Sequence, residues 1–315
     1  MLLALAAFSA IAVYCTAMSL HTVDLLTKSV AADVSIKEYR ETLEGVRGFP
    51  YQWRLLGTYM VFAGERLTGL GPHTVDLALK WALLFVSSAM LFLFSQWYVT
   101  ESGALAVVAL YLLLTVAGFT DEQYRIYFTN DYVMIACWFA AVYLVKTGRY
   151  AGAAALAFVG AFAKETMLLV PVLLAFCAWR SREARGGFAL AVAAFAVPTA
   201  IVRTVYRAPL GQWAWWDMVF ANVPFLQSSM YEFKLTIKNN LKVALFYNVC
   251  WVMAARRVVT LADPFARDLA ATGVVYLLIA YPVIYIRELR HFLPLAIVVL
   301  PLAVSAVEAH RAPVR

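Results

Sequence analysis

The residues best placed to do chemistry in this sequence are charged side chains that interrupt apolar stretches. Lys164 and Glu165 lie between two apolar runs, 151–163 and 167–179. Each run is shorter than the roughly 20 apolar residues that cross a bilayer. The pattern predicts a broken or re-entrant pair of helices, which can hold an ion or an anionic ligand. The alternative is a Lys–Glu pair that caps a turn at the membrane surface.

A second group of charges lies close to the C-terminus, where Arg287, Glu288, Arg290 and His291 separate two apolar segments. Residues 287, 290 and 291 share one helical face. Two guanidinium groups and an imidazole on one face can bind a phosphate or pyrophosphate. A basic turn that contacts lipid headgroups explains the same residues equally well.

The segment 120–132 is acidic and aromatic and contains Asp121, Glu122 and Asp131. Carboxylate oxygens suit Mg²⁺ or Mn²⁺ and can also accept hydrogen bonds from sugar hydroxyls. The alternative is that Asp121 pairs with Arg125 at helical spacing. These residues are therefore candidates for binding an acceptor or a cation.

Asp24 and Asp33 follow the first apolar segment, and either could act as a general base beside the membrane. Each also has a structural interpretation, since Asp24 can pair with Lys28 and Asp33 can satisfy backbone groups at a helix start. Arg54 interrupts an apolar stretch further along and either binds a phosphate or extends to headgroups.

Composition places these groups in a membrane protein. The chain has 315 residues, of which 63% are hydrophobic and only 14% charged, so its polar side chains are too few to cover a soluble globule. The net charge of +7 comes mainly from short loops, which argues against nucleic-acid binding. The four cysteines lie far apart in apolar runs, which argues against a disulfide framework or a zinc site.

We therefore expect an all-α fold, a polytopic transmembrane helical bundle that forms a single membrane domain over residues 1–315. About ten membrane segments are predicted, including the broken pair. They are 1–20, 80–98, 103–119, 131–145, 151–163, 167–179, 188–202, 241–254, 269–286 and 292–307.

The loop charges predict the orientation. With both termini in the cytoplasm, the short basic loops lie inside, and the long segments 21–79 and 203–240 lie outside. The first of these contains a capping-box pattern, Ser35-Ile-Lys-Glu38, and an apolar stretch at 51–70 that carries charges. Both patterns indicate interfacial helices. Any chemistry is expected on the outer face.

This layout resembles the GT-C superfamily of membrane glycosyltransferases, which have a first span, a long outer loop with acidic residues, and many further spans. Four local stretches are similar to those of bacterial GT-C-like proteins. They are Pro50-Tyr-Gln-Trp-Arg-Leu-Leu56, Asn130-Asp-Tyr132, Ala163-Lys-Glu-Thr166, and Arg287-Glu-Leu-Arg290 followed by Phe292-Leu-Pro294.

The resemblance implies transfer of a sugar from a polyprenyl-phosphate donor to an acceptor on the outer face of a bacterial inner membrane. It makes Asp33 the first candidate for the base and Asp24 the second. The residues expected around the donor phosphate are Arg54, Lys164, Arg287, Arg290 and His291. Those expected at the acceptor or a divalent cation are Asp121, Glu122, Asp131 and Glu165.

Two other classes of protein fit the sequence. The broken Lys164–Glu165 hairpin is also typical of transporters and lipid flippases. A non-catalytic membrane subunit that docks a protein partner is the third possibility. It predicts that an outer cavity lined by Lys164, Arg287 and the acidic residues of the loops is absent or packed shut.

Overall fold

The computed structural model of the protein describes residues 2–27, 36–37, 39–42, 44, 54–119, 129–205, 223, 227, 229–283 and 289–311. Every regular element in these ranges is helical, which confirms the all-α expectation. A helix satisfies its backbone hydrogen bonds internally, and an apolar chain in lipid requires this. The elements are α1 (Leu2–Thr27), α3 (Leu56–Thr68), α4 (Pro72–Ser95), α5 (Glu101–Phe119), α6 (Thr129–Lys146), α7 (Tyr150–Ala161), η2 (Glu165–Leu168), α8 (Leu169–Ala178), α9 (Arg182–Val205), α11 (Met230–Tyr247), α12 (Val249–Thr260), α13 (Pro264–Val283), η4 (Leu289–Leu295) and α14 (Ala296–Arg311).

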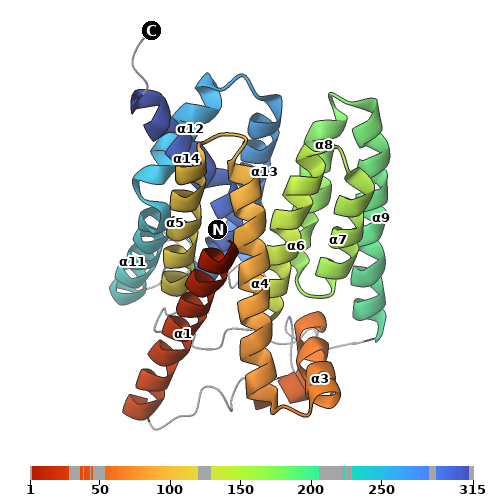
Figure 1. The fold of residues 1–315 in the computed structure, drawn as a ribbon, viewed down its shortest axis with the longest axis vertical. Coiled ribbons are helices and arrows are strands. Elements are labelled where there is room, and N and C mark those ends of the chain that lie inside the picture. Colours follow the sequence, from red (N-terminus) through yellow and green to blue (C-terminus); the bar gives the residue numbers. More distant parts are fainter. Residues whose placement is uncertain are drawn as a thin grey trace. The chain divides into compact units, whose positions relative to one another are not determined.

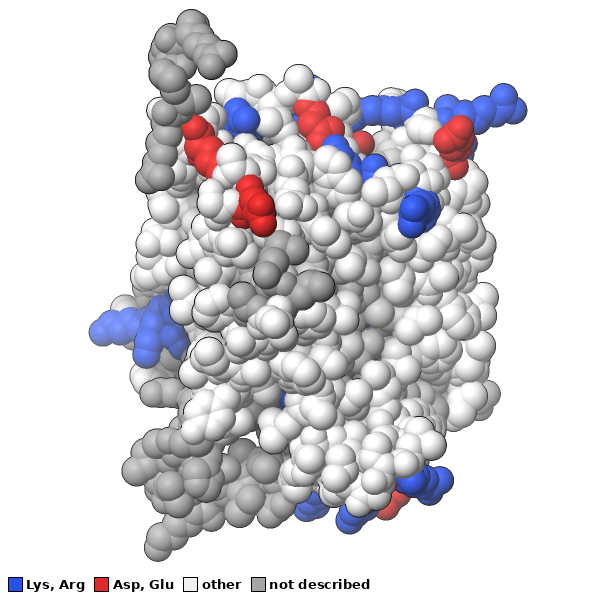
Figure 2. Space-filling model, in the orientation of Figure 1, with Lys and Arg blue, Asp and Glu red and all other residues white. Residues whose placement is uncertain are grey.

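Several of these helices are long and apolar enough to cross a bilayer, so the chain is an integral membrane protein. Within the described ranges there are four: α4, α5, α9 and the continuous stretch Leu289–His310. The pair α11 and α12 makes a fifth candidate, bent by 56°. In Figure 2 wide uncharged areas separate small groups of charged side chains, as expected of a surface in lipid.

The prediction of about ten spans is not confirmed within the described residues, and three of the predicted segments have a local reason. Helix α6 has 18 residues, but it begins with the polar residues Thr129, Asn130 and Asp131, which lower its hydropathy. Helices α7 and α8 have only 12 and 10 residues. The predicted interruption between them is present: α7 ends at Ala161, and the 3₁₀ turn η2 begins at Glu165.

The C-terminal part of the predicted outer loop 203–240 is helical. Helix α11 begins at Met230, and the Ser229 side chain accepts a hydrogen bond from the Glu232 N–H at 3.2 Å. This is half of a capping box, a signal that the sequence carries. At the other end, Asn248 adopts a φ of 46° and separates α11 from α12 within the predicted span 241–254.

The helices group into two compact units, and the prediction of a single membrane domain stays a prediction. The first unit comprises 1–90 and 124–210, and the second comprises 91–123 and 211–315. In the first unit, α6, α7, α8 and α9 pack as neighbours (Figure 1). Small residues allow the close packing: a Cβ on Gly187 would lie 2.5 Å from the Tyr150 side chain, and one on Gly160 would lie 2.7 Å from Met167.

The two ends of the first unit differ in chemistry. Because α6 to α9 run alternately up and down, the α6–α7 and α8–α9 connections lie at one end, which we call the basic end. It carries Lys146, Arg149, Arg180, Arg182 and Arg185. The other end, which we call the polar end, holds α3 and the first turn of α6.

The second unit is built around η4, α14, α5 and α12. Two tyrosines hold the backbone of η4: the Tyr247 hydroxyl donates to the Phe292 carbonyl at 2.8 Å, and the Tyr276 hydroxyl donates to the His291 carbonyl. A Cβ on Gly118 would lie 3.4 Å from the Arg290 backbone. Hydrogen bonds from side chains thus replace α-helical ones where η4 interrupts regular geometry.

Candidate functional site

A short helical segment of the first loop packs at the polar end of the first unit. Residues 36–37 and 39–42 are helical, which confirms the predicted helix in its described part. Ile36 and Tyr39 are buried against Val61 of α3, with Phe62 and Leu79 packed beside them. On the opposite face, Lys37 and Glu41 form an exposed pair at 3.8 Å. Apolar burial therefore fixes which face of this segment meets the bundle.

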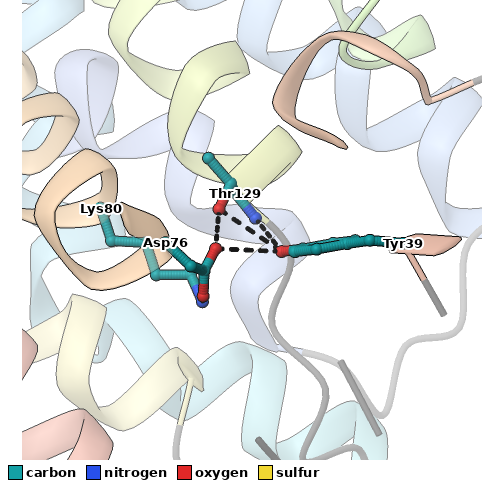
Figure 3. Close-up of polar contacts among 4 residues, drawn as sticks. All are labelled: Tyr39, Asp76, Lys80 and Thr129. Atoms are coloured by element: carbon teal, nitrogen blue, oxygen red, sulfur yellow. Dashed lines mark hydrogen bonds and ion pairs between the residues drawn. The ribbon is translucent and has the colours of Figure 1, made fainter. Parts of the chain in front are cut away.

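Figure 3 shows the polar contacts of Tyr39 from this segment with Thr129 and Asp76, and we call the cluster that they form with Lys80 the Tyr39 clasp. The Thr129 N–H donates to the Tyr39 hydroxyl oxygen at 2.9 Å, and that hydroxyl donates to Asp76 Oδ1 at 3.3 Å. The Thr129 hydroxyl donates to the same carboxylate oxygen, and the Lys80 ammonium contacts Oδ2. All four residues are at most 6% exposed.

The clasp joins the first loop, α4 and α6, and its polar groups are satisfied internally. Burial, and then the Asp76 carboxylate, raise the pKa of Tyr39 well above its ordinary value of 10.0. The buried phenol thus stays protonated, whereas the phenol of an unfolded chain ionises near pH 10. Its contribution to stability is therefore complete at neutral pH and declines only above pH 10.

We expect Tyr39→Phe to lower the free energy of unfolding by about 1–2 kcal/mol, because it leaves the Thr129 N–H and the Asp76 carboxylate each without one partner. Unfolding of the detergent-solubilised protein measures the loss, and hydrogen exchange should quicken at 36–44. Tyr231→Phe removes a hydroxyl from a side chain that is 75% exposed and serves as the control. Equal stability of the two variants would contradict the role of the clasp.

Three successive side chains in the first turn of α6 each contact a different part of the fold. Successive residues of a helix point about 100° apart, so Thr129, Asn130 and Asp131 face different neighbours. Thr129 belongs to the Tyr39 clasp, Asn130 contacts the start of α3, and Asp131 contacts the residue before η2. This arrangement explains why the polar residues that shorten the apolar part of α6 are buried.

Asn130 binds the backbone at two points, one in the first turn of α3 and one just before it. Its Oδ1 accepts from the Gly57 N–H at 2.7 Å, and its Nδ2 donates to the Arg54 carbonyl at 2.9 Å. A Cβ on Gly57 would lie 2.6 Å from the Asn130 backbone nitrogen. Glycine is therefore required where α3 and α6 approach each other.

Lys164 and Asp131 form a closed ion pair. The Lys164 ammonium donates to Asp131 Oδ1 at 2.5 Å, and both side chains are only 4% exposed. Lys164 is in extended conformation between α7 and η2, which directs it away from either helix axis toward α6. Each charge is therefore neutralised by the other inside the protein.

Arg54 and Glu165 form a second ion pair, which is more open. Arg54 Nη2 lies 3.4 Å from Glu165 Oε2, and the side chains are 13% and 37% exposed. The other carboxylate oxygen, Oε1, is buried and makes no hydrogen bond in the part of the chain that the structure describes. The Leu55 and Leu56 N–H groups both donate to the Phe162 carbonyl, which holds Arg54 beside the broken helix.

The structure thus brings four of the predicted site residues together: Arg54, Lys164, Asp131 and Glu165. Arg290 and His291 belong to the second unit and are 5% and 7% exposed. The other predicted residues, Asp33, Asp121, Glu122 and Arg287, lie outside the described residues, as does the side chain of Asp24.

Sequence reasoning missed the charged part of the Tyr39 clasp. Asp76 and Lys80 have the i, i+4 spacing of a helical ion pair, which was a usable signal. It was overlooked because the predicted span began at Lys80, whereas α4 begins two turns earlier, at Pro72. No local pattern assigns the hydroxyl of Tyr39 or the amide of Asn130 to distant partners.

The fold and the site define an integral membrane protein of helices whose first unit carries buried ion pairs at one end. The described residues contain no group of three or more His, Cys, Asp or Glu side chains that could hold a metal ion. Comparison with models of protein families, with curated proteins and with solved structures finds no match to this chain.

Proposed function

We propose that the protein is a GT-C-like membrane glycosyltransferase that moves a sugar from a polyprenyl-phosphate donor to an acceptor on the outer face of a bacterial inner membrane. The basic end of the first unit supports this orientation, because Lys and Arg favour the cytoplasmic side. The polar end, with its ion pairs and docked first-loop segment, is then the outer end. A cytoplasmic location of both termini is part of the same proposal.

The observation that carries the proposal is the open Arg54–Glu165 pair. A guanidinium forms its strongest contacts as two parallel hydrogen bonds, whereas Arg54 reaches Glu165 through a contact of 3.4 Å. A phosphate group can form such a pair of contacts with a guanidinium and would compete with Glu165 for Arg54. Arg54 is therefore the leading candidate for binding the donor phosphate. Lys164 is paired with Asp131, so we propose only an indirect role for its charge.

In the proposed reaction, a carboxylate of the first loop accepts the proton of the acceptor hydroxyl as that oxygen attacks the sugar. Asp33 is the first candidate and Asp24 the second. The bond between the sugar and the phosphate breaks, and Arg54 stabilises the negative charge that grows on the leaving phosphate. Arg287, Arg290 and His291 remain proposed for the phosphate. Asp121, Glu122, Asp131 and Glu165 remain proposed for the acceptor or a divalent cation.

The test compares binding of a polyprenyl phosphate with binding of the uncharged polyprenol, using native mass spectrometry of the protein in lipid nanodiscs. We expect the phosphate to be retained in preference to the alcohol. Equal retention of both would mean that no phosphate is recognised, and the transferase proposal would then be abandoned.

A non-catalytic membrane subunit is the second candidate function. It is favoured by the Lys164–Asp131 pair, whose side chains are buried against each other. This role predicts that a protein partner copurifies with the chain. It also predicts that Asp33→Asn and Asp24→Asn leave the cellular phenotype unchanged. The transferase predicts loss of the phenotype in at least one of those variants.

A further inference from the structure

We propose that Asn130 is a positioning residue that sets the place of the Arg54 guanidinium. The inference rests on the phosphate-binding role proposed for Arg54 and adds a residue to that site. Asn130 is 2% exposed and lies in the first turn of α6, so it does not itself meet a ligand. Its effect on binding must pass through the backbone that it holds.

Asn130 makes one hydrogen bond on each side of the start of α3. Its Nδ2 donates to the carbonyl of Arg54, and its Oδ1 accepts from the N–H of Gly57, three residues later. The N-cap residue of α3 is Leu55, whose side chain cannot accept a hydrogen bond from the first turn. Asn130 therefore acts as the cap of α3 from a neighbouring helix.

The residues on either side of Asn130 hold the part of α6 that carries it. Thr129 is held in the Tyr39 clasp on one side, and Asp131 is held by Lys164 on the other. Because α6 is anchored at both neighbouring positions, the backbone that carries Asn130 is held in place, and the two hydrogen bonds of its amide then orient the side chain. Loss of that amide releases the Arg54 backbone on one side, although Phe162 still holds Leu55 and Leu56.

We expect Asn130→Ala to weaken binding of the polyprenyl phosphate by about fivefold, as for the loss of one ordinary hydrogen bond. The isosteric Asn130→Asp keeps the acceptor for Gly57 but places an oxygen against the Arg54 carbonyl, and should also weaken binding. It provides a second variant if the alanine form does not fold. Asn239→Ala removes another buried amide, on α11, and should bind as the wild type does.

A double-mutant cycle with Arg54→Gln distinguishes positioning from general destabilisation. If Asn130 acts through Arg54, adding Asn130→Ala to Arg54→Gln should cause no further loss of binding. Two independent losses that multiply would overturn the inference, and so would wild-type binding by both Asn130 variants. If Arg54→Gln alone binds as well as the wild type, the proposed role of Arg54 fails first, and the inference fails with it.

Discussion

Replacement of Lys164 by alanine should destabilise the protein by about 3–5 kcal/mol, the largest loss of stability expected from any single change discussed. The variant leaves the Asp131 carboxylate buried without its cation, and an uncompensated buried charge carries that cost. Asp131→Ala should have a similar effect for the opposite charge. Unfolding of the purified protein in detergent measures both, and Lys37→Ala, at a side chain that is 76% exposed, is the control.

The same pair separates a structural role from a binding role. Replacing both partners by apolar residues, Lys164→Met with Asp131→Leu, should recover most of the lost stability, because no charge is then left buried. If this double variant still binds a polyprenyl phosphate as the wild type does, Lys164 contributes only to the fold. Stability within about 1 kcal/mol of the wild type in each single variant would show that the pair opens to water.

Local sequence patterns predicted the helical class, the interruption at Lys164–Glu165 and the first-loop helix, because each depends on spacing within a short segment. Partners far apart in sequence were not predictable in this way. Lys164 and Asp131 are separated by 33 positions and meet only because α6, α7 and η2 pack together. The sequence assigned them to different ligands, whereas in the fold they bind each other.

The prediction of about ten membrane segments is not confirmed within the described residues, where two of those segments are short helices. A count of apolar residues treats each apolar run as a separate membrane segment, although α7 and α8 are short helices that pack against α6 and α9. Each of these helices buries part of its apolar surface within the first unit. Polar residues such as Asn130 in turn looked like a loop beside the membrane, but they are buried because they satisfy the backbone of α3.

The charges of the Arg54–Glu165 pair should act on lipid binding in opposite directions. Arg54→Gln removes the guanidinium and should weaken binding of a polyprenyl phosphate by about 10- to 100-fold, since a charged hydrogen bond contributes about 1.5–3 kcal/mol. Glu165→Gln keeps the shape of the side chain but removes the anion that competes for Arg54. It should strengthen binding by about fivefold, a smaller change because the pair is partly exposed.

Opposite effects of Arg54→Gln and Glu165→Gln on lipid binding would distinguish a ligand-binding pair from a structural one. If the pair only stabilised α3 against η2, both variants would lower stability and neither would improve binding. Arg66→Gln on the exposed face of α3 and Glu101→Gln at the start of α5 make the same charge changes at exposed positions, and should leave binding unchanged. A fall in affinity for Glu165→Gln would mean that the carboxylate itself contacts the ligand. In that case the acceptor or cation role predicted for Glu165 would replace its role as the resting partner of Arg54.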